Sequence, residues 1–201
     1  MLKRGMILAT LFMIWSGASY ADNAQLRRGA QVVVDVCSGC HSLKYLKYTD
    51  LLQLGFSPAE VTKMRGTGGG YILSQLSPAD ALTAFNTVPP DLSLMAKARE
   101  GGPLYIYKMI TGFYTDDKGQ TQNKVFPGIK MPDVFMISQA DPASRRVIEA
   151  KAADVAAFLE WASDPLVEER KSLGRYVIGY LIFLTLLLYL LKRKIWSGLK
   201  P

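Results

Sequence analysis

Histidine and cysteine are scarce in this chain, which has one histidine and two cysteines among 201 residues. A structural zinc site needs four nitrogen or sulfur ligands, so the chain would have to borrow at least one from another molecule. Ligation of one metal by two histidines of the chain is excluded. A sustained alternation of apolar and polar residues is also lacking, which argues against a sheet-based domain.

The scarce residues are gathered in one motif, Cys37-Ser38-Gly39-Cys40-His41. Two cysteines separated by two residues and followed by a histidine are typical of c-type haem attachment. Both thiols then bond covalently to the haem, and the imidazole becomes an axial iron ligand. The spacing places the cysteines about one helical turn apart, at one edge of the macrocycle. A redox dithiol and part of a zinc site are the alternative interpretations of the pair.

The N-terminus has the features of a secretory signal peptide. Lys3 and Arg4 precede an apolar run from Met6 to Trp15, and Ser19-Tyr20-Ala21 offers small residues for cleavage. We therefore expect residues 1–21 to be a cleaved signal peptide. An uncleaved anchor is the alternative, although the run is shorter than the roughly 20 residues of a spanning helix. Export agrees with the motif, because haem c is attached outside the cytoplasm.

A second apolar segment lies near the C-terminus. Residues 176–191 carry no charge and are followed by Lys192, Arg193 and Lys194. With its flanks this run can cross the hydrocarbon core, so we expect a transmembrane helix over residues 174–194. The basic residues favour a cytoplasmic tail over residues 195–201. A buried core helix is the alternative, which apolar residues on all sides of the helix disfavour.

The excess of positive charge comes from these two ends. The formal net charge is +7, and seven basic residues outside the central region account for it: Lys3, Arg4, Arg175, Lys192, Arg193, Lys194 and Lys200. Residues 22–173 contain equal numbers of basic and acidic side chains. The charge thus reflects targeting and topology and gives no support to nucleic-acid binding.

The domain between the two apolar segments is large enough for a single core. Residues 25–36 are expected to form a helix leading into the motif, with Gly29 at a close helix crossing. Residues 145–162 are expected to form a helix that packs across the first. Ser57 and Ser77, each followed by proline, are predicted N-caps with an acidic residue three positions later. The apolar side of the second helix is predicted to consist of Val147, Ala150, Val155, Phe158 and Leu159.

A methionine is the expected sixth iron ligand, because His41 is the only histidine. The methionines that remain after export are Met64, Met95, Met109, Met131 and Met136. Met131 is favoured because Pro127-Gly128 and Pro132 bound a loop that can hold its thioether rigidly, whereas methionines in helix-like stretches are explained by packing. Met136 is the second candidate. A thioether ligand raises the reduction potential and fills the sixth position, which suits electron transfer.

Five segments of the chain resemble the cytochrome c1 family, the membrane-anchored haem subunits of quinol:cytochrome c reductase (the cytochrome bc1 complex). These segments are residues 25–51, 89–93 (PPDLS), 96–114, 127–135 (PGIKMPDVF) and 154–174. Their order, the late methionine and the C-terminal anchor also agree with the family. The resemblance implies an all-α fold: a class I cytochrome c-like haem domain over residues 22–173 with a single C-terminal transmembrane helix.

The cofactor that the resemblance implies is one covalently attached haem c. Cys37 and Cys40 would form its thioethers, and His41 and Met131 would ligate the iron. Two cysteines leave none for the additional disulfide of some relatives, so packing has to hold the loops.

The resemblance also implies a role for three residues around the haem. The loop of residues 89–93, which contains Pro90, would line the haem edge, and Arg99 and Tyr105 would lie near the propionates, where a guanidinium can pair with a carboxylate. The alternatives are a solvated helix charge for Arg99 and a core aromatic for Tyr105. Lys130 departs from the alanine that is common in the family, and residues 57–83 match it weakly.

The function implied is one-electron transfer. Electrons would pass from a Rieske iron-sulfur protein to haem c and on to a soluble or membrane-bound cytochrome c, in a dimeric respiratory complex that includes a cytochrome b subunit. Quinol oxidation would occur on another subunit. The expected location is a bacterial inner membrane, with the haem domain in the periplasm and the C-terminus in the cytoplasm. The balanced charge of the domain lacks the acidic docking surface of some relatives, which leaves the acceptor open.

Two alternative functions remain from the sequence. The first is a membrane-anchored haem c subunit of another respiratory complex, such as a terminal oxidase. The second is a haem-based sensor, which requires Met131 to be labile or absent from the iron. The short tail of residues 192–201 argues against the sensor, because it leaves no room for an output domain.

Overall fold

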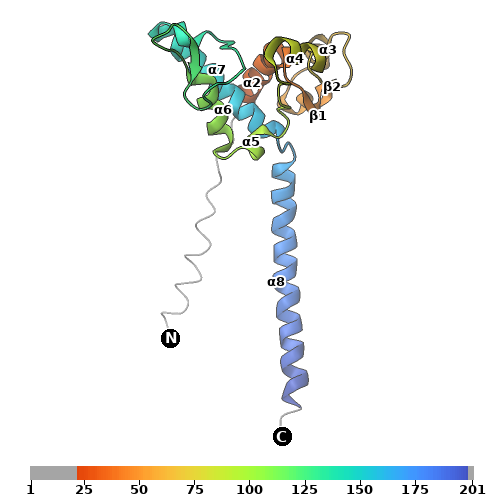
Figure 1. The fold of residues 1–201 in the computed structure, drawn as a ribbon. Helices are drawn as coiled ribbons and strands as arrows, with labels where there is room; N and C mark the ends of the chain where they lie inside the picture. Colours follow the sequence, from red (N-terminus) through yellow and green to blue (C-terminus); the bar gives the residue numbers. More distant parts are fainter. Residues whose placement is uncertain (1–21, 199–201) are drawn as a thin grey trace.

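The computed structural model describes residues 22–198, which form a helical domain followed by one long helix (Figure 1). The helical content confirms the expected fold class. The predicted signal peptide, residues 1–21, lies outside the described residues, and the expected tail is described only as far as residue 198.

The domain is built on the crossing of α2 (Asn23–Asp35) and α7 (Pro142–Ala162). Gly29 lies at the crossing, where a Cβ atom would be 2.1 Å from the carbonyl oxygen of Asp154. Beside it, the Arg28 guanidinium donates to both carboxylate oxygens of Asp154, at 2.7 and 3.1 Å. Only glycine allows so close an approach, so the predicted crossing at Gly29 is confirmed.

Aspartate side chains determine where these two helices begin. The Asp22 carboxylate accepts from the Gln25 backbone N–H at 2.6 Å, and Asp141 accepts from those of Ala143 and Ser144 at 2.9 and 3.2 Å. Both are N-caps, which satisfy amide groups that lack a partner inside the helix. Because of them, α2 and α7 begin two and three residues before the predicted starts.

Ser57 and Ser77 are the N-caps of α3 (Pro58–Arg65) and α4 (Pro78–Phe85), as predicted. Ser57 accepts from the Glu60 N–H at 3.3 Å, and the Glu60 carboxylate accepts from the Ser57 N–H at 2.7 Å, which completes a capping box. At the second cap, the Asp80 carboxylate accepts from the Ser77 hydroxyl instead, at 2.6 Å. Aspartate is one methylene shorter than glutamate, so the second box is incomplete.

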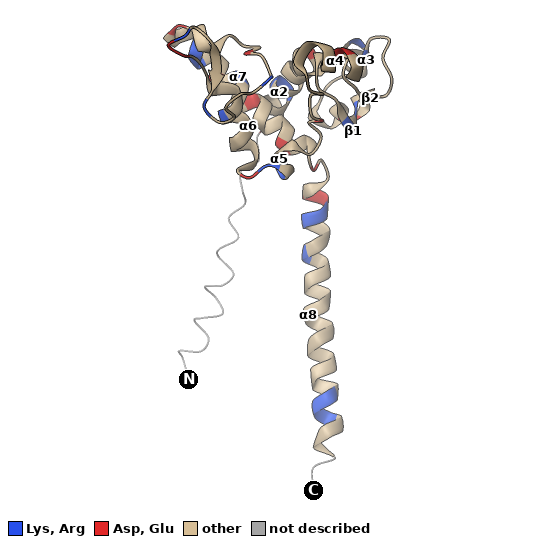
Figure 2. Cartoon of the chain, in the orientation of Figure 1, with Lys and Arg blue, Asp and Glu red and all other residues tan. Residues whose placement is uncertain are grey.

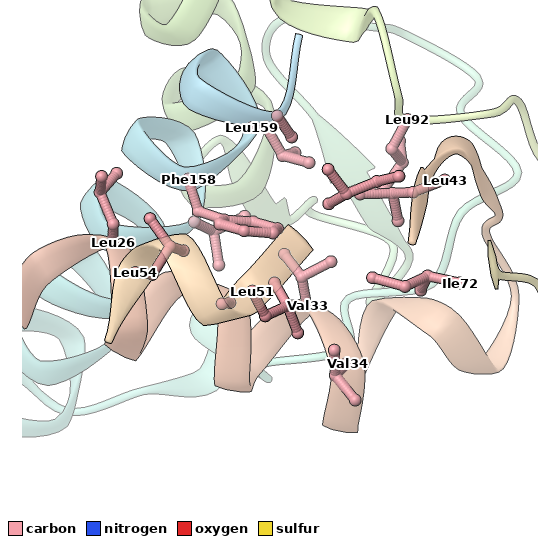
Figure 3. Close-up of a cluster of buried hydrophobic side chains, with 14 of the residues drawn as sticks. Leu26, Val33, Val34, Leu43, Leu51, Leu54, Ile72, Leu92, Phe158 and Leu159 are labelled. Atoms are coloured by element: carbon pink, nitrogen blue, oxygen red, sulfur yellow. The ribbon is translucent and has the colours of Figure 1, made fainter. Parts of the chain in front are cut away.

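The core lies where α7 meets α2, β1 (Leu43–Lys47) and η2 (Tyr48–Leu54), and Figure 3 shows its side chains converging on Phe158. Phe158 is fully buried and stacks on Trp161, with 5.7 Å between ring centroids. Burial of each large apolar side chain contributes about 1.5–3 kcal/mol. The buried residues around Phe158 include Leu26, Val33, Leu43, Leu51, Leu54 and Leu159.

The predicted apolar side of α7 is only partly buried. Val155, Phe158 and Leu159 are in the core, but Val147 is 56% exposed and Ala150 is also exposed. The prediction is wrong for these two residues because the inward side of α7 in this part runs through Ile148 and Ala152 instead, which are half-buried and fully buried.

Two short antiparallel ribbons interrupt the helical fold. β1 pairs with β2 (Tyr71–Ile72), and β3 (Phe113–Thr115) pairs with β4 (Thr121–Asn123) so that Phe113 faces Asn123. β2, β3 and β4 have two or three residues, too few to give an alternating pattern in the sequence, and β1 is irregularly paired. The remaining elements are η1 (Cys37–Gly39), α5 (Met95–Ala98), α6 (Gly102–Thr111) and η3 (Ile137–Gln139).

The last helix, α8 (Val167–Ser197), projects from the domain (Figure 1). None of its side chains is buried, which overturns the alternative of a core helix. Its 31 residues measure about 46 Å along the axis at 1.5 Å per residue. It is the one helix among the described residues that is long and apolar enough to cross a membrane. Figure 2 shows its charged residues at the two ends, with none in the long middle part.

Asp164 lies at the joint between α7 and α8. Its carboxylate accepts from Lys97 Nζ at 2.7 Å and also pairs with the Arg170 guanidinium. Lys97 belongs to the domain and Arg170 to α8, so one carboxylate connects the two. The hydrogen bond from Lys97 is the main reason why the pKa of Asp164 is lowered.

Candidate haem-binding site

The Cys-x-x-Cys-His motif follows directly on α2. Val36 ends that helix, and the chain continues into the single turn η1. Within this turn the backbone N–H groups of Cys40 and His41 both donate to the Cys37 carbonyl, at 3.1 and 2.8 Å. The two cysteines are therefore one tight turn apart, and both are free and partly buried. This backbone fits two thiols that attach to one edge of a macrocycle.

The environment of the Cys37 thiol bears on the dithiol alternative. Burial raises the pKa of the Cys37 thiol to about 12, with a further contribution from Cys40. Redox-active Cys-x-x-Cys pairs instead have a thiol whose pKa is lowered, because the thiolate is the reactive form. The environment of Cys37 therefore disfavours dithiol chemistry.

His41 is held by a hydrogen bond from its ring to the loop of residues 89–93. The Nδ1 atom lies 2.7 Å from the carbonyl oxygen of Pro90. A carbonyl can only accept, so Nδ1 carries the proton and Nε2 keeps its lone pair. Burial lowers the pKa of His41, which favours the neutral ring, although the bond to Pro90 acts in the opposite direction. A neutral imidazole with its second nitrogen fixed in this way is the usual form of a metal ligand.

Backbone hydrogen bonds attach the Pro90 loop to the segment after His41. The Leu92 N–H donates to the Ser42 carbonyl at 2.8 Å, and the Lys44 N–H donates to the Asp91 carboxylate at 2.9 Å. The Tyr45 N–H donates to the hydroxyl of Ser93, which is fully buried, at 3.1 Å. These bonds keep the Pro90 carbonyl against the histidine ring.

Asp91 and Ser93 belong to the loop that the resemblance implies, but the sequence does not predict their individual roles. The Asp91 carboxylate also accepts from the Ser93 N–H at 2.9 Å, which forms an Asx-turn. An aspartate two residues before a serine, next to Pro90, was the available signal for this turn. It could not indicate that the turn lies against His41, which is 49 residues from Pro90.

Met131 lies in a loop between β4 and η3, as predicted, and its side chain is partly buried. Met95 begins α5 and packs against the core, and Met109 lies within α6, which agrees with a packing role. Met136 is 72% exposed and has a positive φ of 54°. Ligation of iron by Met131 stays a prediction.

Arg99 and Tyr105 lie around α5 and α6. Arg99 is the C-cap of α5, is exposed, and takes part in no ion pair within residues 22–198. Tyr105 is partly buried in α6 and packs against the core, as the core-aromatic alternative expects. Of Pro90, Arg99 and Tyr105, the structure brings Pro90 alone into hydrogen-bond contact with the His41 ring. The roles of Arg99 and Tyr105 stay predictions.

Comparisons with known proteins identify the family of the chain. The profile of the family described as Cytochrome C1 family matches residues 15–69 and 71–199. Cytochrome c1 of Rhodospirillum rubrum is 34% identical, over 89% of this chain and 83% of the relative. Cytochrome c1 of Allochromatium vinosum is 32% identical, over 88% of this chain and 85% of the relative. The cytochrome b/c1 of Bradyrhizobium diazoefficiens is 31% identical, over 88% of this chain and 33% of that longer protein. The chain therefore belongs to the cytochrome c1 family.

Proposed function

We propose that this protein is the haem c subunit of a quinol:cytochrome c reductase, and that it passes single electrons from a Rieske iron-sulfur protein to a cytochrome c. The observation that carries the proposal is the Cys37-x-x-Cys40-His41 turn with its histidine bonded to Pro90. The membership of the chain in the cytochrome c1 family, which implies covalent haem c, supports it.

The residues of the site fit a covalently held haem c. Cys37 and Cys40 would tether it, and His41 would offer Nε2 to the iron while Pro90 orients the ring through Nδ1. Bound there, haem c supplies a one-electron couple between ferric and ferrous iron. Met131 would provide a thioether, which favours the ferrous state and closes the sixth position. Arg99 and Tyr105 are proposed to lie near the propionates.

The proposed topology places the electron-transfer domain outside the cytoplasm. Residues 1–21 are a cleaved signal, residues 22–173 lie in a bacterial periplasm, residues 174–194 cross the inner membrane, and residues 195–201 face the cytoplasm. The exposed apolar surface of α8 and the basic residues at its end support this arrangement. Deleting residues 174–201 is expected to release a soluble domain, and a fragment that stays in the membrane would contradict the cleaved signal.

The proposed partners are a cytochrome b subunit, the Rieske protein and a cytochrome c acceptor, within a dimeric complex. The name of the Bradyrhizobium diazoefficiens relative, cytochrome b/c1, joins the first of these to a c1 portion and supports it. Co-purification with a cytochrome b tests the assignment. Association with an oxidase subunit instead would favour another respiratory complex.

Optical spectra of the purified protein test the haem and its ligands. Oxidised, reduced, and reduced carbon monoxide-treated samples are compared for the unaltered protein, Met131→Ala and Met136→Ala. We expect a methionine-to-iron band and no carbon monoxide binding in the unaltered protein. Met131→Ala should lose the band, bind carbon monoxide and lower the potential by on the order of 0.1 V.

The exposed Met136 provides the matched control, and Met136→Ala should leave all three spectra unchanged. If Met136→Ala, and not Met131→Ala, loses the band, Met136 is the ligand. If the unaltered protein binds carbon monoxide readily, the sixth position is open and the sensor function is favoured.

A further inference from the structure

The loop that carries Met131, residues 124–136, is fixed at both ends. We call these residues the Met131 loop. It contains no helix or strand, and its ends lie at β4 and η3. An irregular segment of this length loses considerable conformational entropy when it is ordered, so contacts at its ends determine how firmly its middle is held.

Asn123 fixes the start of the Met131 loop. Its side chain is 2% exposed, and its Nδ2 donates to the carbonyl of Met109 in α6 at 2.8 Å. Its Oδ1 accepts from the backbone N–H groups of Val125 and Phe126 at 2.9 and 3.2 Å. One buried amide therefore joins the beginning of the loop to the last turn of α6.

The residue after α6 leaves room for this amide. Gly112 is buried, and a Cβ at this position would be 2.6 Å from the Lys108 carbonyl oxygen and 3.3 Å from Asn123 Oδ1. The Gly112 carbonyl in turn accepts from the Lys124 N–H at 3.0 Å. The start of the loop is thus in direct contact with the end of α6.

Arg145 fixes the other end of the loop. Its Nη2 donates to the Thr111 carbonyl at 3.2 Å, and its Nη1 donates to the carbonyl of the fully buried Ile137 at 3.4 Å. Its Nε pairs with Glu149 at 3.2 Å, one turn along α7. All three nitrogens of the guanidinium are used, which a lysine ammonium cannot reproduce.

Asp133 connects this anchor to Met131. Its carboxylate accepts from the N–H groups of Ile137 and Ser138 at 3.1 and 2.8 Å. Asp133, two residues after Met131, is therefore held at Ile137, which Arg145 contacts.

Both anchors meet at the same place, the C-terminal turn of α6. Met109 and Thr111 lie in the last turn of this helix, where carbonyl groups lack partners within the helix. Asn123 supplies a donor to the first and Arg145 to the second. The two ends of the Met131 loop are thus attached to one rigid element.

We propose that Asn123 and Arg145 are positioning residues for the methionine–iron bond. They hold the ends of the Met131 loop at α6, so that the thioether stays in place and does not leave the iron. The inference rests on the proposed function, because it takes Met131 as the ligand.

The strength of the hydrogen bonds from Arg145 gives the size of the expected change in ligation. A hydrogen bond from a charged donor changes an equilibrium constant by about tenfold or more. Removal of Arg145 should therefore increase the fraction of molecules with Met131 off the iron by about tenfold to a hundredfold.

Arg145→Ala and Arg146→Ala form the matched pair for the test. The residues are neighbours of equal charge, but Arg146 is exposed and takes part in no ion pair within residues 22–198. We would purify each full-length holoprotein and measure the methionine-to-iron band, the potential, and the carbon monoxide-bound fraction at a fixed subsaturating concentration.

Arg145→Ala is expected to weaken the band, lower the potential and raise the carbon monoxide-bound fraction about tenfold or more, with covalent haem content unchanged. Arg146→Ala should match the unaltered protein. Equal behaviour of the two variants would overturn the role of Arg145. If Arg145→Ala does not accumulate, Arg145→Lys is measured in the same way. Lysine keeps the charge and the stem but cannot reproduce the three contacts of the guanidinium, so the same changes are expected, and their absence would overturn the role of Arg145.

Asn123→Ser tests the other anchor in the same way, and Gln122→Ser on the adjacent position is its control. Met131→Ala separates this inference from the proposed function. If Met131→Ala binds carbon monoxide but neither anchor variant does, Met131 is the ligand and the positioning role is wrong. If Met131→Ala has no effect, the ligand assignment itself has failed.

Discussion

The segments around His41 and Met131 are held in different ways. The His41 side consists of a turn, a short strand and the Pro90 loop, which are joined by closely spaced backbone hydrogen bonds. The Met131 side is a longer loop whose firmest contacts are at its two ends. In Figure 1, β1 and β2 lie on one side of α2, and α6 lies on the other.

This difference indicates which side is robust and which is adjustable. Many short-range bonds, with two covalent tethers in the holoprotein, would keep the histidine in place when any one contact is lost. A loop that is held mainly at its ends is expected to shift when either end contact is lost. We therefore expect stability changes to dominate on the His41 side and changes in ligation to dominate on the Met131 side.

The largest effect is expected when the tether of the His41 side is removed. The double variant Cys37→Ser, Cys40→Ser leaves no thiol to form a thioether. Haem staining of the denatured protein should fall from full to background, while each single variant should retain one bond. Covalent haem in the double variant would show that attachment occurs elsewhere.

A methyl group at the helix crossing should disturb both sides together. In Gly29→Ala the new Cβ would lie 2.1 Å from the Asp154 carbonyl oxygen, so α2 and α7 must separate. We expect a loss of about 3 kcal/mol in the free energy of unfolding, measured by denaturant titration. Gly69→Ala, where no atom lies within 4 Å of the added Cβ, is the control. A loss confined to one side would mean that the crossing does not couple them.

Asp91→Ala tests the robustness of the His41 side. The backbone N–H groups of Lys44 and Ser93 lose their acceptor, which should cost about 2 kcal/mol. Haem should stay attached and inaccessible to carbon monoxide. The exposed Asp117 provides a control in Asp117→Ala. Carbon monoxide binding by Asp91→Ala would contradict the comparison.

In contrast to Asp91→Ala, Asp133→Ala should change ligation more than stability. Ile137 and Ser138 lose a capping carboxylate, which costs about 1 kcal/mol. Because Asp133 is two residues from Met131, we expect carbon monoxide binding to rise despite the smaller loss of stability. Asp133→Asn, which keeps one acceptor oxygen, should be intermediate. A variant that loses stability without any change in ligation would remove the distinction between the two sides.

The smallest effect is expected at Asp164, which belongs neither to the His41 side nor to the Met131 side. Its pKa is lowered in the folded protein, so its contribution to stability is present above the pKa of the unfolded carboxyl and is lost as the pH falls through the folded pKa. Asp164→Asn should flatten the acid limb of the stability curve and leave the potential unchanged. A shift in potential would show that the joint with α8 communicates with the haem.

Local patterns in the sequence predict the framework of the domain. Proline after serine indicates where α3 and α4 begin, and Gly29 among larger residues indicates the crossing. Apolar periodicity correctly predicts α7 but not which of its sides faces inward near Val147, which is exposed while the adjacent Ile148 is half-buried. Burial depends on where the neighbouring elements lie, which a local pattern does not contain.

The contacts that hold the residues of the candidate site in place are harder to predict. The motif identifies Cys37, Cys40 and His41 by spacing alone. Pro90 is implied only by the resemblance to a family, because 49 residues separate it from His41 and no local pattern connects the two. Arg145 contacts a carbonyl 34 residues away, and in the sequence it is indistinguishable from Arg146. Such contacts depend on how helix ends meet.

In the proposed holoprotein, the absence of a side chain at Gly29 would affect the speed of electron exchange. The helix that ends at the haem motif and the helix that bears Arg145 are in backbone contact there, with no side chain between them to flex. Closely packed interiors have low compressibility, so ligands supported from this crossing would shift little when the iron changes charge. A small shift would mean a small reorganisation energy for the proposed haem, so the crossing would affect the rate of electron exchange from a position outside the ligand set.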